Sequence, residues 1–186
     1  MNSKSILILF ALALLLCSLA FVRARQRRWQ GDSSAGEALI SDNTDASRIC
    51  ELRIEGSSSQ MTLQLKEGAW RMLEANGASV HVDTLQIFVA DLLQAKILRT
   101  ISDGKLEDFG LTPQTGCISV KLLDSEGNPL AEAILGRRIM RQNPNAGDGV
   151  EDMISVGRYV LHNGMPAVVA NPFLPADYTK EEWLAK

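Results

Sequence analysis

The sequence predicts an α+β domain with a mainly antiparallel sheet, carried behind an N-terminal membrane segment. Three observations predict it: an uncharged apolar run opens the chain, one amphipathic helical pattern lies near its middle, and short alternating patterns separated by turn residues fill the rest. With 186 residues and 46% apolar content, the chain is long enough for one globular domain with a core. A formal net charge of -3 provides no basic field for a phosphate backbone, so nucleic acid is not expected as a partner.

The first segment has the composition of a transmembrane helix. Residues 1–5 form a short flank, and residues 6–22 are uncharged and apolar until arginines end the run. A helix of that length spans about 25 Å, at the short end of what crosses a bilayer. A transmembrane anchor is therefore expected. A cleaved signal peptide is the alternative, because Ser18-Leu19-Ala20 resembles a signal-peptidase site and Lys4 supplies a positive flank.

Residues 23–47 are expected to be a basic juxtamembrane segment followed by a flexible linker. The stretch from Trp29 to Ser47 is rich in Gly, Ser, Asp and Asn and has neither helical nor strand periodicity. The arginines before it would place the domain in the cytoplasm by the positive-inside rule. Alternatively, they contact anionic headgroups wherever the domain lies. These cationic residues are Arg23, Arg25, Arg27 and Arg28.

The globular domain is expected over 48–186, beginning with a three-stranded meander and a helix. Apolar and polar residues alternate over 50–55 and over 61–66, and a third run carries Trp70 and Met72. A single apolar stripe with helical spacing then predicts a core-facing helix. We expect Asp83 to cap this helix, with Gln86 completing a capping box and Val82 packing on Ile87. The stripe consists of Leu85, Phe88, Val89, Leu92 and Leu93.

Further short strands are expected in the second half. "ILRTIS" at 97–102 predicts one strand, and 118–123 with 130–136 predict a hairpin turned by "DSEGNP". Residues 137–149 lose periodicity and are expected to form an irregular loop. Asn163-Gly164 predicts a tight hairpin, in which Pro166 would place the last strand at the sheet edge. A short C-terminal helix is expected to follow. Its capping box would pair Thr179 with Glu182, and Tyr178 would pack on Trp183.

The triplet Asp108-Phe109-Gly110 would bind magnesium in a protein kinase. A kinase also needs a Gly-rich loop, a strand lysine paired with a helix glutamate, and a catalytic "HRD" loop, none of which the sequence contains. We therefore expect a structural turn with Gly110 in the left-handed conformation, which directs Phe109 and Leu111 into the core. Asp108 is expected to be an ordinary surface residue.

Several short motifs carry a resemblance to a known family. They are Trp70 at the end of the meander, Phe109-Gly110-Leu111, "ILG" ending at Gly136, and Tyr159 before the closing hairpin. Over roughly residues 48 to 184 the chain resembles the bacterial family named domain of unknown function 4340 (DUF4340). Two features depart from the family pattern: Phe109 stands where the family usually has tyrosine, and many members are longer, with repeated units.

The resemblance implies a cellular location but no activity. Members of this family have an N-terminal anchor, are usually envelope proteins, and in some cases accompany ABC transporter components of the gliding-motility type. The resemblance therefore implies a single-pass protein of the bacterial inner membrane with its domain in the periplasm. It implies no catalytic residue and no cofactor.

Catalytic and metal sites are not expected. His81 and His162 are the only histidines, and neither adjoins a nucleophile motif. His81 and Asp83 would supply only two metal ligands, and "GDGVED" does not match a calcium loop. Cys50 and Cys117 could pair in an oxidising compartment, or remain free as small apolar residues of strands.

We expect a non-enzymatic accessory domain that binds a protein partner. Its recognition surface is predicted at Arg137, Arg138 and Arg141 with the Asn- and Gly-rich stretch that follows, because binding residues concentrate on loops. A solvated loop without a partner is the alternative for that segment. Two other function classes stay open: a carrier of a small apolar or lipid ligand, which needs a cavity of several hundred Å³, and a hydrolase, which needs a histidine beside a serine or cysteine.

Overall fold

The computed structural model describes residues 36–41, 43–57, 59–144 and 152–185. The chain divides into two units, Met1–Ser33 and Ser34–Lys186, and the described residues all belong to the second. The predicted anchor at 6–22 therefore lies outside the described residues. In the part that the structure describes, no helix is both long enough and apolar enough to cross a membrane.

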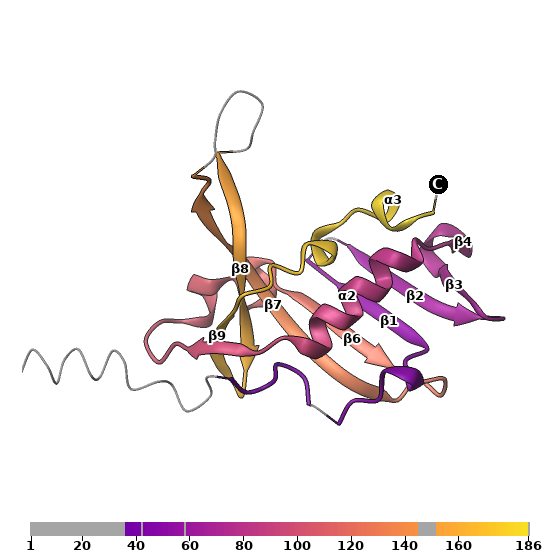
Figure 1. The fold of residues 1–186 in the computed structure, drawn as a ribbon, viewed down its shortest axis with the longest axis horizontal. Coiled ribbons are helices and arrows are strands. Elements are labelled where there is room, and N and C mark those ends of the chain that lie inside the picture. Colours follow the sequence, from indigo (N-terminus) through magenta and orange to yellow (C-terminus); the bar gives the residue numbers. More distant parts are fainter. Residues whose placement is uncertain (1–35, 42, 58, 145–151, 186) are drawn as a thin grey trace, which may run out of the picture. The chain divides into compact units, whose positions relative to one another are not determined.

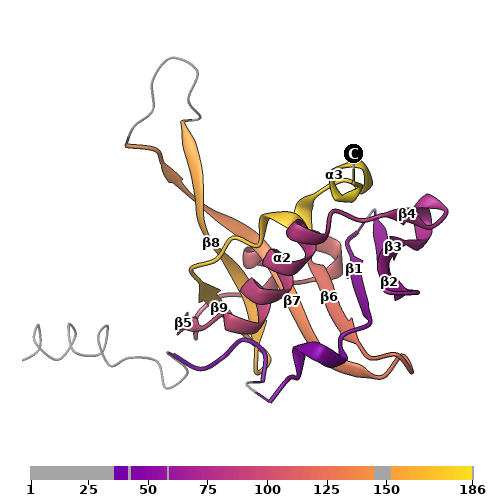
Figure 2. The ribbon, with the colours of Figure 1, turned by 45° about the vertical axis from the view of Figure 1, so that its right-hand side comes forward.

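The second unit is built on one antiparallel sheet, which confirms the predicted α+β class. Its nine strands are ordered β4-β3-β2-β1-β6-β7-β8-β9-β5, and helix α2 (Val82–Gln94) lies across one face (Figures 1 and 2). A short helix, α3 (Lys180–Trp183), ends the described chain. The strands are β1 (Glu51–Glu55), β2 (Gln60–Lys66), β3 (Ala69–Met72), β4 (Ala78–Ser79), β5 (Ile97–Thr100), β6 (Ile118–Leu123), β7 (Pro129–Gln142), β8 (Met153–His162) and β9 (Met165–Val169). Five 3-10 turns also lie in the described residues: η1 (Ala46–Arg48), η2 (Leu73–Ala75), η3 (Leu106–Phe109), η4 (Pro113–Thr115) and η5 (Leu174–Asp177).

The predicted meander and both hairpins are present. β1 pairs with β2, β2 pairs with β3, and β6 pairs with β7 around the predicted turn. β8 pairs with β9 around Asn163 and Gly164, whose φ angles of 50° and 77° are both positive. Two successive positive φ angles are the requirement of a type I′ turn, which an Asn-Gly pair satisfies at little cost.

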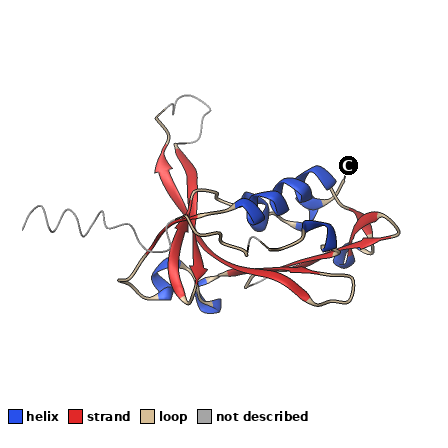
Figure 3. Cartoon of the chain, turned by 60° about the horizontal axis from the view of Figure 1, so that its bottom comes forward, coloured by secondary structure: helices blue, strands red, loops and turns tan. Residues whose placement is uncertain are grey.

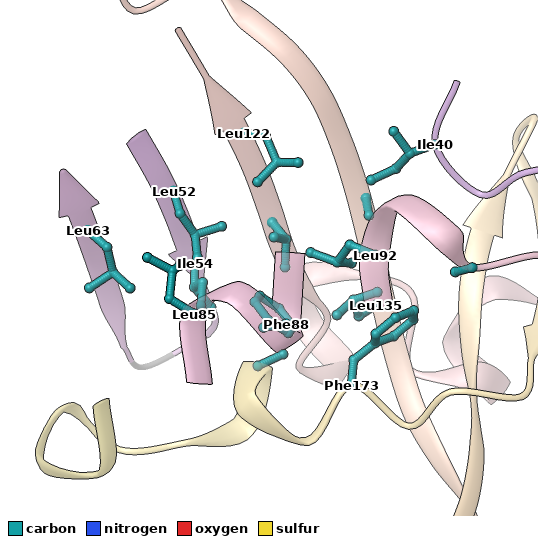
Figure 4. Packing of buried hydrophobic residues seen from close by; sticks show 14 of the residues in the cluster. Ile40, Leu52, Ile54, Leu63, Leu85, Phe88, Leu92, Leu122, Leu135 and Phe173 are labelled. Atoms are coloured by element: carbon teal, nitrogen blue, oxygen red, sulfur yellow. The ribbon is translucent and has the colours of Figure 1, made fainter. Parts of the chain in front are cut away.

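The core lies between α2 and the sheet (Figure 4). Leu85, Phe88 and Leu92 are buried on one side of α2, as their spacing predicts. They pack against alternating residues of the central strands, including Leu52 and Leu122, because alternate side chains of a strand share one face. The C-terminal segment closes the cluster, with the Trp183 ring centroid 5.8 Å from that of Phe88.

The predicted start of α2 was wrong. The helix begins at Val82 with His81 at the N-cap position, so Asp83 lies inside the first turn. Val82 and Ile87 are both exposed, so neither side chain is buried by the expected packing. The N-cap residue is held by a tertiary contact, because the backbone N–H of His81 donates to the carbonyl of Trp183 at 2.8 Å.

The C-terminal helix agrees with its prediction in detail. The backbone N–H of Thr179 donates to Glu182 Oε2 at 2.7 Å, as a capping box requires. The Tyr178 ring packs on Trp183 with centroids 6.3 Å apart. These local contacts hold a helix of only four residues, which would not form by propensity alone.

The prediction that β9 lies at the edge was also wrong, because β9 lies between β8 and β5. The carbonyl of Pro166 accepts from Ile101 N–H at 2.7 Å, so the backbone of Pro166 faces the β5 side. Thr100 is the last residue of β5 and pairs with Ala167. The missing N–H of Pro166 therefore falls opposite Ile101, just past the last residue of β5, so no hydrogen bond between the paired residues of β5 and β9 is lost.

The linker predicted to reach residue 47 is shorter than expected. Gly36 N–H donates to Ile97 O at 2.7 Å, Ile97 N–H donates to Glu37 O at 2.8 Å, and Leu39 N–H donates to Ala95 O at 2.8 Å. Ile40 belongs to the core. The predicted linker has a polar composition overall, but it includes the short apolar sequence Ala38-Leu39-Ile40. This sequence packs on the domain.

The irregular stretch predicted from residue 137 begins later. β7 continues to Gln142, and its partner β8 begins at Met153. The residues Arg-Arg-Ile-Met-Arg-Gln do not alternate between apolar and polar because this part of the strand pair is open to solvent on both faces. Strand periodicity is visible only where one face is buried. Residues 145–151 lie outside the described residues.

Candidate partner-binding site

The end of the β7–β8 hairpin projects beyond the rest of the sheet (Figures 1 and 3). β6 stops pairing with β7 at Leu135, and β9 stops pairing with β8 at Arg158. Beyond these points the two strands pair only with each other, from Arg138 to Gln142 and from Met153 to Gly157. We call these two segments the arm. A two-stranded ribbon without further strands or a covering layer is marginally stable in water, so the arm's exposure requires an explanation.

The arm exposes large apolar side chains. Met140 and Met153 are each 44% exposed, Val156 is 39% exposed and Ile154 is 36% exposed. By the strand register, Met140 and Met153 share one face of the arm and Ile154 lies on the other. Soluble domains usually expose such residues singly, so their concentration on one element indicates an interaction surface. The open edges of both strands add unpaired backbone donors and acceptors to that surface.

A cleft of about 550 Å³ lies where the arm meets the C-terminal segment. Met140, Met153 and Ile154 line it from the arm, and Leu174 lines it from η5. The enclosed Oγ of Ser155, which also lines the cleft, has no hydrogen-bond partner among the described residues. A buried polar atom without a partner costs free energy, and a binding partner could satisfy it.

The three predicted arginines lie on β7 and have different neighbours. Arg137 packs against Gly110, where a Cβ on that glycine would stand 2.7 Å from Arg137 Cγ. Arg138 reaches Asp177, with 3.6 Å between Nε and Oδ2. Arg141 is opposite Ile154 on the arm and is exposed. Of the three, only Arg141 belongs to the arm without a described role in holding the domain together.

A buried arginine holds the base of the arm, and the sequence patterns did not single it out. Arg158 is 3% exposed and makes five hydrogen bonds. Its Nε donates to Gly136 O at 2.8 Å, and its two terminal nitrogens donate to the two carboxylate oxygens of Asp177 at 2.8 and 2.9 Å. The remaining bonds go to the carbonyls of Pro172 and Phe173. The one available signal was a single cationic residue inside the apolar strand sequence "VGRYV". A cation at a buried position of a strand requires a hydrogen-bonded or anionic partner.

Five of the six motif residues of the family resemblance meet in one structural cluster. Gly110 caps η3 in the left-handed conformation, with φ 69° and ψ 32°, as predicted. Leu111 is buried, and the half-buried Phe109 ring lies 5.0 Å from the Tyr159 ring. Gly136 lies against the backbone of Phe109 and the side chain of Leu111, since a Cβ at Gly136 would collide with the carbonyl oxygen of Phe109 and stand 2.9 Å from Leu111 Cδ2. This cluster fastens η3 to β7 and β8, and its role is structural.

Asp108, next to this cluster in the sequence, differs from expectation. Asp108 is not an ordinary surface residue, because its Oδ2 accepts the backbone N–H of Lys105 at 3.0 Å and caps the η3 turn. Trp70 lies apart from the cluster, on β3, where it is half-buried beside the core. In the triplet at 108–110, Asp108 therefore caps the η3 turn, Phe109 packs its ring on Tyr159, and Gly110 ends the turn in the left-handed conformation.

Among the described residues, the side-chain hydrogen bonds of the two histidines involve no serine or cysteine. His162 Nε2 lies 2.9 Å from Glu37 Oε2 and 3.2 Å from Asn163 Nδ2. The His81 side chain is exposed and makes no capping hydrogen bond to α2. Within the described ranges, no group of three or more His, Cys, Asp or Glu residues could hold a metal ion.

Cys50 and Cys117, the cysteines among the described residues, are free thiols and cannot pair with each other. Glu51 of β1 pairs with Leu123 of β6, and Glu55 pairs with Ser119. Cys50 and Cys117 therefore lie at opposite ends of this strand pair, about 20 Å apart at ~3.3 Å per residue. A disulfide needs Cα atoms within ~7 Å. Burial raises the pKa of the Cys117 thiol, which makes it less reactive.

Comparisons with known proteins identify no relative: no family model matches the chain, and neither the curated proteins nor the solved structures include a significant match. The resemblance to the DUF4340 family stays a prediction that rests on the motifs given above.

Proposed function

We propose that this protein is a membrane-tethered accessory module of a bacterial envelope, without enzymatic activity, that binds a protein partner through the arm. The observation that carries the proposal is the group of large apolar side chains on an otherwise uncovered strand pair. A partner that covers Met140, Met153 and Ile154 would bury apolar area and could satisfy the Ser155 hydroxyl.

The arm is also firmly connected to the domain that carries it. Arg158 joins β8 to β7 and to the C-terminal segment at the base of the arm. The cluster of Phe109, Gly136 and Tyr159 fastens η3 to the same two strands. A binding element on a rigid base loses less conformational entropy when its partner docks.

The proposed cellular location rests on the predicted anchor at 6–22 and on the family resemblance. Together they favour a single-pass protein of the bacterial inner membrane with the domain in the periplasm. The resemblance adds an ABC-transporter-type complex as the assembly in which the partner is to be sought.

The test is capture of partners by the full-length protein with two matched variants. Ile154→Asp places a charge on the arm, and Ile87→Asp places the same charge on the exposed side of α2, where Ile87 is 60% exposed. A membrane protein captured by the wild type and by Ile87→Asp should be reduced by roughly tenfold or more with Ile154→Asp, as for a central interface residue. Equal capture by both variants, at equal melting temperatures, would remove the arm from the proposal.

A further inference from the structure

A second concave surface lies away from the arm, between α2 and the strands β2 and β3. It is a groove of about 440 Å³. Leu65 and Trp70 line it from the strands, and Val89, Ala90 and Leu93 line it from α2. None of its lining residues is charged, and its polar members are the amide side chains of Gln86 and Gln94.

The groove leaves apolar side chains partly open to water. Leu65 is 37% exposed, and Trp70, Val89 and Leu93 are only partly buried although they pack against the core. The apolar stripe of α2 is thus wider than the part that the sheet covers. An apolar occupant would gain by covering the remainder, at roughly 25 cal/mol for each Å² removed from water.

The chemistry of the lining selects the class of ligand. A groove without charged residues has nothing to pair with a phosphate, a carboxylate or an ammonium group, so ionic small molecules are poor occupants. Its volume is within the ~300–1,000 Å³ range of ligand sites. An alkyl chain fits both conditions, because it needs apolar walls and no hydrogen-bond partner.

The tether places a source of alkyl chains within reach. Residues 23–35 connect the predicted anchor to Gly36, the first described residue, and 13 residues extend to at most about 45 Å. On that basis, which rests on the membrane tether of the proposed function, we propose that the groove binds one acyl chain of a membrane phospholipid. The headgroup stays outside the groove, in water.

The experiment uses the full-length protein in phosphatidylcholine nanodiscs. A trace of phosphatidylcholine carries a photoreactive diazirine near the methyl end of one acyl chain, and labelled peptides are mapped by mass spectrometry. Chain ends that remain in the bilayer can label only the predicted anchor. Labelling of Leu65, Trp70 or Leu93 requires that the chain has entered the groove, and labelling confined to 6–22 would overturn the proposal.

Matched variants separate the groove from the arm. Ala90→Glu puts a carboxylate into the groove and should lower its labelling by roughly tenfold or more, because an unpaired charge is costly against an alkyl chain. Ile87→Glu, on the exposed side of the same helix, should leave labelling unchanged. Ile154→Asp should also leave it unchanged, so failure of the arm proposal is distinguishable from failure of this one. Equal labelling of Ala90→Glu and Ile87→Glu would refute groove binding.

Discussion

Gly136→Ala should destabilise the domain although this glycine has an ordinary strand conformation. A methyl group at Gly136 would collide with the carbonyl oxygen of Phe109 and would stand 2.9 and 3.1 Å from Leu111 Cδ2 and Cγ. The carbonyl belongs to the backbone of the η3 turn, which is fixed by Leu111 N–H donating to Leu106 O at 3.0 Å. The methyl therefore cannot be accommodated by a side-chain rotation alone.

The magnitude follows from two opposed effects. Overpacking a fixed neighbour costs roughly 1–3 kcal/mol, and a backbone neighbour favours the upper part of that range. Alanine in a strand recovers about 0.5–1 kcal/mol relative to glycine. The expected net loss is about 2 kcal/mol, which lowers the melting temperature of a domain of this size by roughly 4–8 °C.

Two other glycines provide the controls. Gly127 has φ 83° and nothing within 4 Å of its ideal Cβ, so Gly127→Ala should cost only the left-handed strain, about 1 kcal/mol. Gly110→Ala combines the same strain with a contact 3.2 Å from the backbone nitrogen of Arg137 and should cost about 2 kcal/mol. Urea unfolding of the full-length protein measures all three variants. If Gly136→Ala lost no more stability than Gly127→Ala, the packing of β7 on η3 would be refuted.

Three further predictions concern charged groups. Arg158→Met should cost on the order of 3 kcal/mol, because it leaves three carbonyls and a carboxylate without their donor, and a melting temperature equal to wild type would contradict the buried network. Asp108→Ala should lower the free energy of unfolding by about 1 kcal/mol, because the cap of η3 is lost. No change in the free energy of unfolding would show that Asp108 does not stabilise the domain. The backbone N–H of Asn128 donates to Asp124 and holds the pKa of that carboxyl below its usual value, so the unfolded chain binds the proton more tightly. The stabilisation is present above the unfolded pKa of ~3.9 and is lost as the pH falls through the folded pKa. In Asp124→Asn the melting temperature should therefore fall less steeply at acid pH than in the wild type. An equal dependence of the melting temperature on pH in both proteins would refute the assignment.

Patterns that depend on near neighbours in the chain could be predicted. The stripe at Leu85, Phe88 and Leu92 is buried as its spacing indicates, and the Asn163-Gly164 turn joins β8 to β9. Gly110 stops η3 in the left-handed conformation. Each of these is decided within one helical turn or one hairpin, where side-chain spacing and φ preference are sufficient.

Features that depend on distant partners could not be predicted in the same way. Arg158 is stabilised in the core by Asp177 and by carbonyls that only the folded chain brings to it. Pro166 is tolerated in an inner strand because β5 ends beside it. Arg137, Arg138 and Arg141 were expected in an irregular loop, but they lie on β7 and have different neighbours, because β7 extends into the arm.

The sequence by itself determined the α+β class, the main helix, the closing hairpin and the turn at 108–110, since these follow from local periodicity and backbone preference. Only the tertiary structure decided where α2 starts, which strands lie at the sheet edges, and that Cys50 and Cys117 are too far apart to pair. It also decided which apolar residues remain uncovered, on the arm at Met140 and Ile154 and in the groove at Leu65. The physical reason is that burial is a property of pairs of elements: a side chain's pattern shows that it can be covered, and only its neighbours in space show whether it is.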